Sequence, residues 1–150
     1  MTKAAEPMTR KVVIVPPDMS LSAAWALMCR EHFRHLPVVS GRTLIGILSD
    51  RDVLVRATVE KGIVTVPDTR VFEAATPWPH VCRLDTEVCD LVRLMTEKKI
   101  DAVPVVDGTN QLIGLVTSTD LLLLLISREE AHAPLPFVFD LEQHSAVRPN

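Results

Sequence analysis

Two short segments of the chain carry residue types that could bind a phosphorylated sugar. Residues 46–52 read GILSDRD and residues 114–120 read GLVTSTD, so a hydroxyl residue follows each glycine by three positions and an aspartate follows after three more. We expect both segments to lie where a strand ends and a helix begins, because free N–H groups at a helix start favour an anion. The glycine lets a ligand or another backbone come close. The fixed carboxylate can accept hydrogen bonds from both vicinal hydroxyls of a ribose.

A purely structural interpretation of the same residues is also open. Ser49 and Thr117 would then cap the helices that follow them, and Asp52 and Asp120 would be first-turn charges that favour the helix dipole. For one copy alone, helix capping is the more common explanation. The occurrence of two copies in matching context favours a ligand site.

The two segments belong to a longer internal repeat. Residues 35–54 read HLPVVSGRTLIGILSDRDVL, and residues 102–122 read AVPVVDGTNQLIGLVTSTDLL. The Pro-Val-Val triplets lie 67 positions apart and the glycine motifs 68 apart, so the second turn holds one extra residue. A unit of this size has little core of its own, and two copies can bury their apolar faces against each other.

Hydrophobic spacing predicts the same order of elements in each repeat: strand, helix, strand, tight turn, strand, helix. Asp18 or Ser20 is expected to cap the first long helix, and Asp85 or Thr86 its counterpart. In the first repeat the predicted elements are residues 12–15, 20–33, 36–39, 44–48 and a helix from about 50; in the second they are 80–83, 86–98, 102–106, 111–116 and 118–127. The predicted division of the chain is repeat one at 4–60, a linker at 61–72, repeat two at 73–130 and a tail at 131–150.

Composition excludes several classes of protein. The formal net charge is −3, without the basic excess expected for binding nucleic acid or an anionic membrane. Three cysteines without a C-x-x-C pair indicate reduced thiols, and the first residues lack the apolar stretch of a secretory signal, so we expect a cytoplasmic protein. The longest apolar run, residues 121–126, is far shorter than the ~20 residues that span a bilayer.

The ordered pair of motifs resembles a tandem pair of cystathionine-β-synthase (CBS) domains, often called a Bateman module. Besides the two hairpin-and-aspartate units, Met8-Thr9 and Thr76-Pro77 resemble the start of each repeat in that family. The resemblance implies an α/β (α+β) fold of two β-α-β-β-α repeats, related by a pseudo-twofold axis in one compact disc. It further implies clefts between the repeats that hold AMP, ADP, ATP or S-adenosylmethionine, sometimes a dinucleotide such as NAD, and a flat homodimer.

By position, the resemblance implies two ligand sites, each drawn from one repeat. An aspartate would hold the ribose of each ligand, hydroxyl residues its phosphate, and apolar residues its adenine. In site one these are Asp52 for ribose, Ser49 and Arg51 for phosphate, Val13, Ile14, Leu36 and Pro37 for adenine, with Arg34 and His35 just before the triplet. In site two they are Asp120, Thr117 and Thr119, then Val81, Cys82, Val103 and Pro104, with Asp101 and Ala102 at the matching positions.

The two expected sites differ in charge. Arg34 and Arg51 belong to the first, whereas Asp101 and Thr119 stand at the equivalent positions of the second. Arginine binds phosphate through several donors, and a neighbouring carboxylate repels it. The sequence therefore predicts that site one prefers a phosphorylated adenosine and that site two binds more weakly or takes an uncharged adenosyl group.

Three functional interpretations follow. The leading one is a regulatory sensor of adenine nucleotides, without catalysis, metal or required cofactor, that signals to an unknown effector protein. The second is a structural interaction module with vestigial clefts. The third, a nucleotide-converting enzyme, would need a general base or a metal near the phosphates, and the sequence offers no such cluster. Two interpretations of the tail, residues 131–150, are open. It is either disordered or docked on the folded repeats through Leu135, Phe137, Val138 and Phe139.

Overall fold

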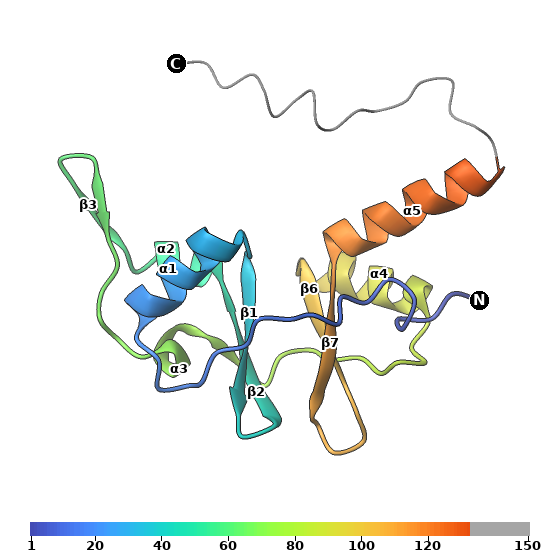
Figure 1. Cartoon of the computed structure of the whole chain (residues 1–150), viewed down its shortest axis with the longest axis horizontal. Coiled ribbons are helices and arrows are strands. Elements are labelled where there is room, and N and C mark those ends of the chain that lie inside the picture. The colour runs from blue at the N-terminus through green and yellow to red at the C-terminus, as the bar shows by residue number, and fades with distance from the viewer. Residues whose placement is uncertain (133–150) are drawn as a thin grey trace.

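The first half of the chain folds as a helix, a β-hairpin and a short helix (Figure 1). The structure is a computed structural model that describes residues 1–132. Helix α1 (Leu21–Glu31) begins after Ser20, whose hydroxyl accepts the Ala23 amide hydrogen at 3.2 Å, as predicted for this cap. It ends at His32, which is left-handed with φ 58°. Strands β1 (His35–Ser40) and β2 (Thr43–Ser49) then pair antiparallel and lead into α2 (Asp50–Leu54).

The second half repeats this order. Helix α4 (Val88–Lys98) ends at Lys99, which is left-handed with φ 53° like His32, and the hairpin of β6 (Ala102–Val106) and β7 (Leu112–Thr117) follows. The N-cap position of α4 is Glu87, whose side chain makes no capping hydrogen bond. The prediction that Asp85 or Thr86 caps this helix was therefore wrong. Helix α5 (Ser118–His132) is longer than predicted and takes up the first two residues of the expected tail. The rest of that tail, residues 133–150, lies outside the described residues.

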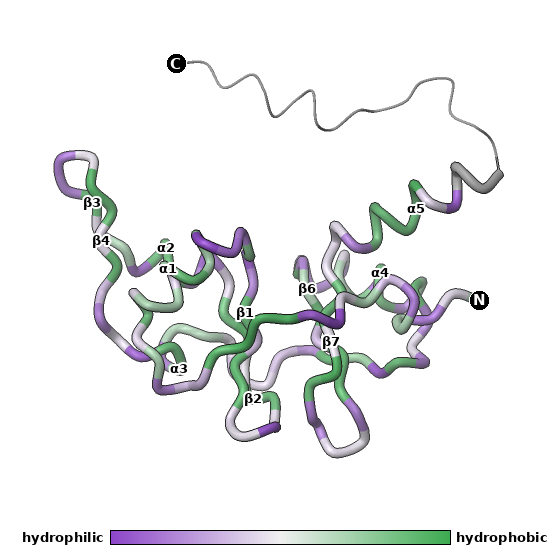
Figure 2. The backbone as a smooth tube through the Cα atoms, in the orientation of Figure 1, coloured by the Kyte–Doolittle hydropathy of each residue, from purple (hydrophilic) through white to green (hydrophobic). Residues whose placement is uncertain are grey.

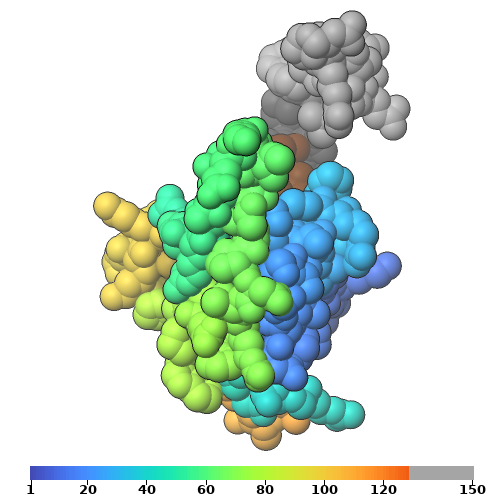
Figure 3. Space-filling model, turned by 90° about the vertical axis from the view of Figure 1, so that its left-hand side faces the viewer, coloured from blue at the N-terminus to red at the C-terminus, as the bar shows by residue number. Residues whose placement is uncertain are grey.

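The segment predicted as a linker holds structure of its own. Strands β3 (Thr58–Glu60) and β4 (Ile63–Thr65) form a hairpin that stands out from the first half, at one end of the molecule (Figure 3). Its two turn residues, Lys61 and Gly62, both have positive φ, 51° and 79°, as a two-residue turn between twisted strands requires. A short helix, α3 (Val71–Ala74), and a two-residue strand, β5 (Thr76–Pro77), complete the connection.

The predicted opening strands at residues 12–15 and 80–83 were wrong, since each makes only one bridging contact. Val15 donates its amide to Pro37 and accepts from Val39, both at 3.0 Å, as a single parallel bridge beside β1. Cys82 does the same beside β6 with Pro104 and Val106. Pro16 has no amide hydrogen to continue the first of these ladders.

Two hydrophobic cores, one in each half, account for most of the buried side chains. The first includes Leu21, Leu36 and Leu48, and the second includes Leu91, Val103 and Val116. A smaller cluster of Val39, Leu44 and Val106 joins the two hairpins. Figure 2 shows the hydrophobic residues concentrated along the strands of both hairpins. The fold is thus the predicted pair of α/β repeats, side by side.

The segment that opens each repeat crosses to the other repeat. Thr9, before the first repeat's helix, exchanges backbone hydrogen bonds of 2.9 and 3.0 Å with Leu115 of β7. Conversely, β5 at the start of the second repeat pairs with β2 of the first. The glycines of both motifs permit this crossing, because a Cβ on Gly114 would lie 2.7 Å from the Thr9 carbonyl oxygen and one on Gly46 would lie 3.0 Å from that of Thr76. Each motif therefore faces a segment from the opposite half.

Candidate ligand-binding cleft

Asp120 lies in the first turn of α5, and both of its carboxylate oxygens are engaged. Oδ2 accepts hydrogen bonds from the Thr117 amide at 2.8 Å and from the Thr117 hydroxyl at 3.0 Å. Oδ1 accepts from the Thr9 hydroxyl at 3.0 Å. The contact with Thr9 is long-range and ties the crossing segment to the start of α5. The carboxylate is held in one orientation, which a site for a ribose requires.

Asp52 occupies the equivalent position at the start of α2. Its Oδ2 accepts the Ser49 amide hydrogen at 2.8 Å, and the Ser49 hydroxyl accepts from the Asp52 amide at 3.1 Å. These two bonds form a capping box. The Asp120 amide likewise donates to the Thr117 hydroxyl at 3.3 Å, so the structural interpretation of the motif holds for both halves. The capping role leaves lone pairs on the carboxylate for a further donor.

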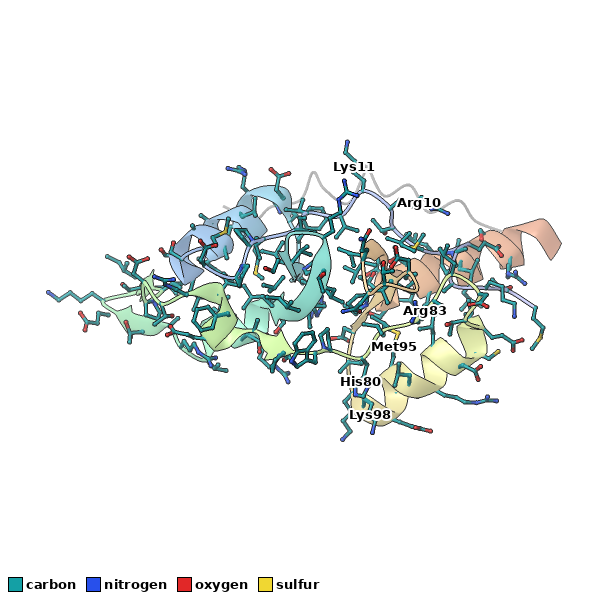
Figure 4. The ribbon with its side chains drawn as sticks, turned by 90° about the horizontal axis from the view of Figure 1, so that it is seen from below. Arg10, Lys11, His80, Arg83, Met95 and Lys98 are labelled. Carbon is teal, nitrogen blue, oxygen red and sulfur yellow. The ribbon has the colours of Figure 1, made fainter. Side chains whose placement is uncertain are left out.

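A cavity of about 270 Å³ lies beside Asp120, between the two halves. Its volume is slightly below the range of ~300–1,000 Å³ that small-molecule sites occupy. The first half supplies Lys11, Val13, Arg34 and His35 to its lining, and the second half supplies a further set: Asp101, Leu115, Thr117, Ser118, Thr119 and Asp120. The first half also supplies Thr9, Val12, His32 and Phe33. Figure 4 shows Lys11 extending from the segment that crosses between the halves.

Basic and acidic groups meet at this cavity. Arg34 Nε lies 3.5 Å from Asp50 Oδ2, and Arg34 Nη2 lies 4.0 Å from Asp101 Oδ2. Arg34 and Asp101 occupy equivalent positions in the two repeats, so the pair spans the join between the halves. Because the Arg34 side chain is 68% exposed, these contacts hold it only weakly and it can turn to an anion in the cavity.

His35 lies at the start of β1, on the wall of the same cavity. Burial is the largest influence on this imidazole and lowers its pKa from 6.5, and the charge of Arg34 lowers it further. The carboxylates of Asp50, Asp101 and Asp52 act in the opposite direction without cancelling the effect. His35 is therefore neutral at pH 7, and the positive charge of the cavity comes from Lys11 and Arg34.

The structure groups the predicted site residues differently from the sequence. Val13, Arg34 and His35, assigned to a site with Asp52, line the cavity that contains Asp120. Ile14 lines a separate cavity of about 290 Å³ together with Arg10 and Arg42. Ser49, Arg51 and Asp52 remain together at the start of α2.

Several residues predicted to line an adenine pocket belong to the hydrophobic cores. Leu36 and Val103 have no exposed surface, and Cys82 and Ala102 are 5% and 7% exposed. Pro37 and Pro104 are buried with them, whereas Val81 is exposed. Burial raises the pKa of the Cys82 thiol to about 11, so this thiol stays protonated and unreactive. A ligand can reach only the main chain beside these buried side chains.

The sequence reasoning missed the residues that cross between the repeats. Thr9, Lys11 and Val12 reach the cavity because the segment that contains them pairs with β7. His32 and Phe33 reach it because α1 ends in a left-handed turn just before β1. Gly114 indicates that another backbone segment approaches β7 closely, because a glycine within a strand often marks such an approach. The sequence does not show that this segment is the one that contains Thr9.

Two further properties of the described residues bear on function. Among residues 1–132, no group of three or more histidine, cysteine, aspartate or glutamate side chains is placed to hold a metal ion. Within the same range, no helix has the length and apolar character needed to cross a membrane.

Comparison with known proteins shows the family to which these features belong. The profile of the CBS domain matches residues 4–58 and 79–127. The CBS domain-containing protein YhcV of Bacillus subtilis is 30% identical over 137 residues, which cover 90% of this chain and 94% of YhcV. Inosine-5'-monophosphate dehydrogenase of Korarchaeum cryptofilum is 34% identical over 111 residues; they make up 74% of this chain and only 22% of the dehydrogenase.

A solved structure agrees with this assignment. CBSX2, a CBS-pair protein of Arabidopsis thaliana, has been crystallised in complex with AMP. That structure matches this one with a TM-score of 0.74 at 26% identity, over 85% of this chain and 98% of CBSX2. The chain therefore belongs to the CBS domain family and carries two CBS domains in tandem.

Proposed function

We propose that this chain is a regulatory module that binds a phosphorylated adenosine, such as AMP, ADP or ATP, in the cavity beside Asp120. The observation that carries the proposal is the composition of this cavity, which joins a fixed carboxylate and a helix start from one half to two cations from the other. Asp120 would hold the ribose hydroxyls. Lys11, Arg34 and the amides at the start of α5 would hold the phosphate.

We propose the reverse of the site preference predicted from the sequence. Arg34 was assigned to the site of Asp52, and on that basis the site of Asp120 was expected to be the weaker one. Because Arg34 and Lys11 line the cavity of Asp120, we assign the phosphorylated ligand to this cavity instead. Asp101 opposes the phosphate, but Arg34 partly neutralises it at 4.0 Å.

The AMP complex of CBSX2 supports the choice of ligand class, since that protein matches this chain over most of both lengths. S-adenosylmethionine and NAD remain alternative ligands, since both contain an adenosyl group with vicinal hydroxyls. Neither presents the terminal phosphate that Lys11 and Arg34 would bind.

Such a ligand would act by bridging the halves. It would contact Arg34 of the first repeat and Asp120 of the second, and so favour one arrangement of the two over others. We expect an effector protein to recognise that arrangement in the cytoplasm, and the module itself to catalyse no reaction. We also expect two copies to form a homodimer through outward side chains of α5 such as Leu123 and Ile126, which are 57% and 49% exposed.

One observation favours a second function, a structural interaction module without a ligand. The capping boxes of α2 and α5 give Ser49, Asp52, Thr117 and Asp120 a structural purpose in both halves. If capping were their whole role, no nucleotide would stabilise the protein.

A thermal-shift screen separates the two functions. The full chain is heated with AMP, ADP, ATP, NAD, S-adenosylmethionine and, as a control for the phosphate, adenosine. A ligand at a hundredfold excess over its Kd stabilises the native state by about 2.7 kcal/mol, which is roughly 5–10 °C for a protein of this size. We expect a nucleotide phosphate to give such a shift and adenosine a much smaller one. A flat response to every compound at millimolar concentration would contradict the proposal.

A further inference from the structure

A second cavity, with a volume of about 290 Å³, lies near the turns of the two long hairpins. The crossing segment, residues 9–15, supplies Arg10, Val12 and Ile14 to its walls. Arg42 comes from the turn of the first hairpin, and residues 111–113 come from the second. We call this space the hairpin cavity. The nucleotide proposal gives none of these side chains a role.

The crossing segment lies between the hairpin cavity and the cavity of Asp120. Of the two cavities, Arg10 and Ile14 line only the first, Lys11 and Val13 line only the second, and Val12 lines both. Alternate side chains of an extended segment point to opposite sides, which explains this division. Figure 4 shows Arg10 and Lys11 leaving the segment in different directions. Two neighbouring cations therefore line two different cavities.

The hairpin cavity is lined by two arginines and by no carboxylate. Among the described residues, neither the Arg10 nor the Arg42 guanidinium takes part in a hydrogen bond or an ion pair. Asp107, on the turn of the second hairpin, is engaged within its own loop, where its Oδ1 accepts the amide hydrogens of Thr109 and Gln111 at 2.8 and 3.0 Å. The lining of the cavity is therefore positive, and guanidinium groups bind anions through several donors.

The shared fold of the repeats does not require arginine at either position. The counterpart of Arg10 in the second repeat is Pro77, 67 positions later. The turn that contains Arg42 corresponds to residues 108–110, which read GTN. Both repeats form the same antiparallel hairpin with these different residues. The two arginines therefore add charge to one copy without a part in the common architecture.

Apolar side chains form most of the remaining wall. Val39 belongs to the buried cluster that joins the hairpins, and Leu112 packs against it. Ile14 is 48% exposed although it is apolar, so a ligand in the cavity could cover it. None of the described lining residues is aromatic, so the cavity offers no ring on which a base could stack. Its volume is slightly below the ~300 Å³ at which small-molecule sites usually begin, which favours a small ligand.

We propose that the hairpin cavity binds a small aliphatic phosphomonoester. Its phosphate would lie at Arg10 and Arg42, and its carbon chain would lie against Val12, Ile14 and Leu112. A phosphomonoester carries roughly 1.5–2 negative charges near pH 7 and three acceptor oxygens, which suits two guanidinium groups. Such a ligand would contact both hairpins. The inference does not rest on the nucleotide proposal, because the two cavities have only Val12 in common.

The probe for this site is n-butyl phosphate, titrated into the full isotope-labelled chain and followed by NMR at the arginine Nε–Hε groups. Signals of Arg10 and Arg42 report on the hairpin cavity, and that of Arg34 reports on the cavity of Asp120. Inorganic phosphate and 1-butanol are titrated separately, as the charged group alone and the carbon chain alone. The free energy of unfolding of each variant, from urea denaturation, shows that it is folded.

We expect the signals of Arg10 and Arg42 to saturate together. The Kd for butyl phosphate should be about tenfold lower than that for inorganic phosphate, as burial of two CH₂ groups would give. Butanol should leave both signals unchanged. Arg42→Gln should raise the Kd measured at Arg10 about tenfold, through loss of a charged hydrogen bond. Arg30→Gln, which removes an exposed cation of α1 outside the cavity, should leave that Kd unchanged.

Three results would overturn the proposal. The first is a shift at Arg10 and Arg42 that rises linearly without saturation, which indicates non-specific contact with the anion. The second is equal affinity for inorganic phosphate and butyl phosphate. The third is displacement of butyl phosphate from Arg42 by AMP, which would show one shared site. Failure of the nucleotide proposal looks different, because AMP would then leave Arg34 unshifted while butyl phosphate still saturates Arg10 and Arg42.

Discussion

Asp52 and Asp120 are equivalent residues in different surroundings. Both accept the amide hydrogen of the hydroxyl residue three positions earlier, at 2.8 Å. Only Asp120, among the described contacts of the two, also accepts a hydroxyl hydrogen from the opposite half, that of Thr9. Capping and ligand binding are compatible, because a carboxylate has about four acceptor positions.

The pKa of His35 predicts how stability depends on pH. Burial lowers this pKa, so the unfolded chain takes up a proton more readily than the folded one. The free energy of unfolding should therefore fall as the pH drops through 6.5, the ordinary value for the side chain. Chemical denaturation at about pH 7.5 and 5.5 should show a smaller loss for His35→Gln than for the unaltered protein. Equal losses would mean that His35 does not titrate differently on folding.

Gly114 should tolerate no side chain. An alanine there would place its Cβ 2.7 Å from the Thr9 carbonyl oxygen and against the Met8 side chain. We expect Gly114→Ala to lower the free energy of unfolding by about 1–3 kcal/mol, as overpacking does elsewhere. Gly108→Ala is the matched control, because its Cβ would meet nothing within 4 Å, and it should cost nothing. A Gly114→Ala protein as stable as this control would contradict the close crossing of Thr9.

At the scale of elements, α2 and the β3–β4 hairpin follow one another but differ in packing. Val53 of α2 is fully buried, whereas Val59 of β3 is 67% exposed. Val53→Ala should therefore reduce the free energy of unfolding by about 2 kcal/mol, from the loss of two buried methyl groups. The same change at Val59 should remain within roughly 0.5 kcal/mol. Urea denaturation measures both, and similar losses would show that the hairpin is part of the folded core.

Most elements could be predicted from the sequence because the residue patterns that indicate them occur in both repeats. Helices α1, α2, α4 and α5, the four long strands and the two hairpin turns follow from matched apolar spacing and turn residues in both copies, whereas α3 lies largely in the segment predicted as a linker. The β3–β4 hairpin has no counterpart among the described residues of the second repeat, so its strands could not be recognised by comparing the two copies. The length of α5 was underestimated because helix formers continue past Ser127 without a stop signal until Pro134.

The site was harder to predict than the elements, for a topological reason. Local spacing identified Thr117 and Asp120, but it could not say which half would face them. That depends on the pairing of Thr9 with Leu115, two residues 106 positions apart in the chain. The sequence assigned Arg34 to the site of Asp52; in the structure Arg34 lies 3.5 Å from Asp50 at the start of α2 and also lines the cavity of Asp120.

At the scale of the whole molecule, the crossing segments join the two repeats through backbone pairing in both directions. Each glycine motif faces a segment of the other half. A ligand in the cavity of Asp120 would therefore contact both repeats. Relative movement of the halves is then coupled to occupancy, which is the physical basis for the proposed signal. Lys11 and Arg34 line this cavity together with Asp101 and Asp120, so the proposed phosphate would lie toward the two cations.

The most direct test of this account is the calorimetric titration of AMP into the unaltered protein, Asp120→Asn and Asp52→Asn. The two variants alter matched capping boxes, and Asp120→Asn also alters the contact with Thr9, so the free energy of unfolding of each variant is measured beside its Kd. Loss of hydrogen bonds to a charged group is worth about 1.5–3 kcal/mol, so we predict a Kd roughly 10- to 100-fold higher for Asp120→Asn. Asp52→Asn should stay within a few-fold of the unaltered protein. Equal weakening in both variants, or a greater loss in Asp52→Asn, would contradict the assignment of the nucleotide to the cavity beside Asp120.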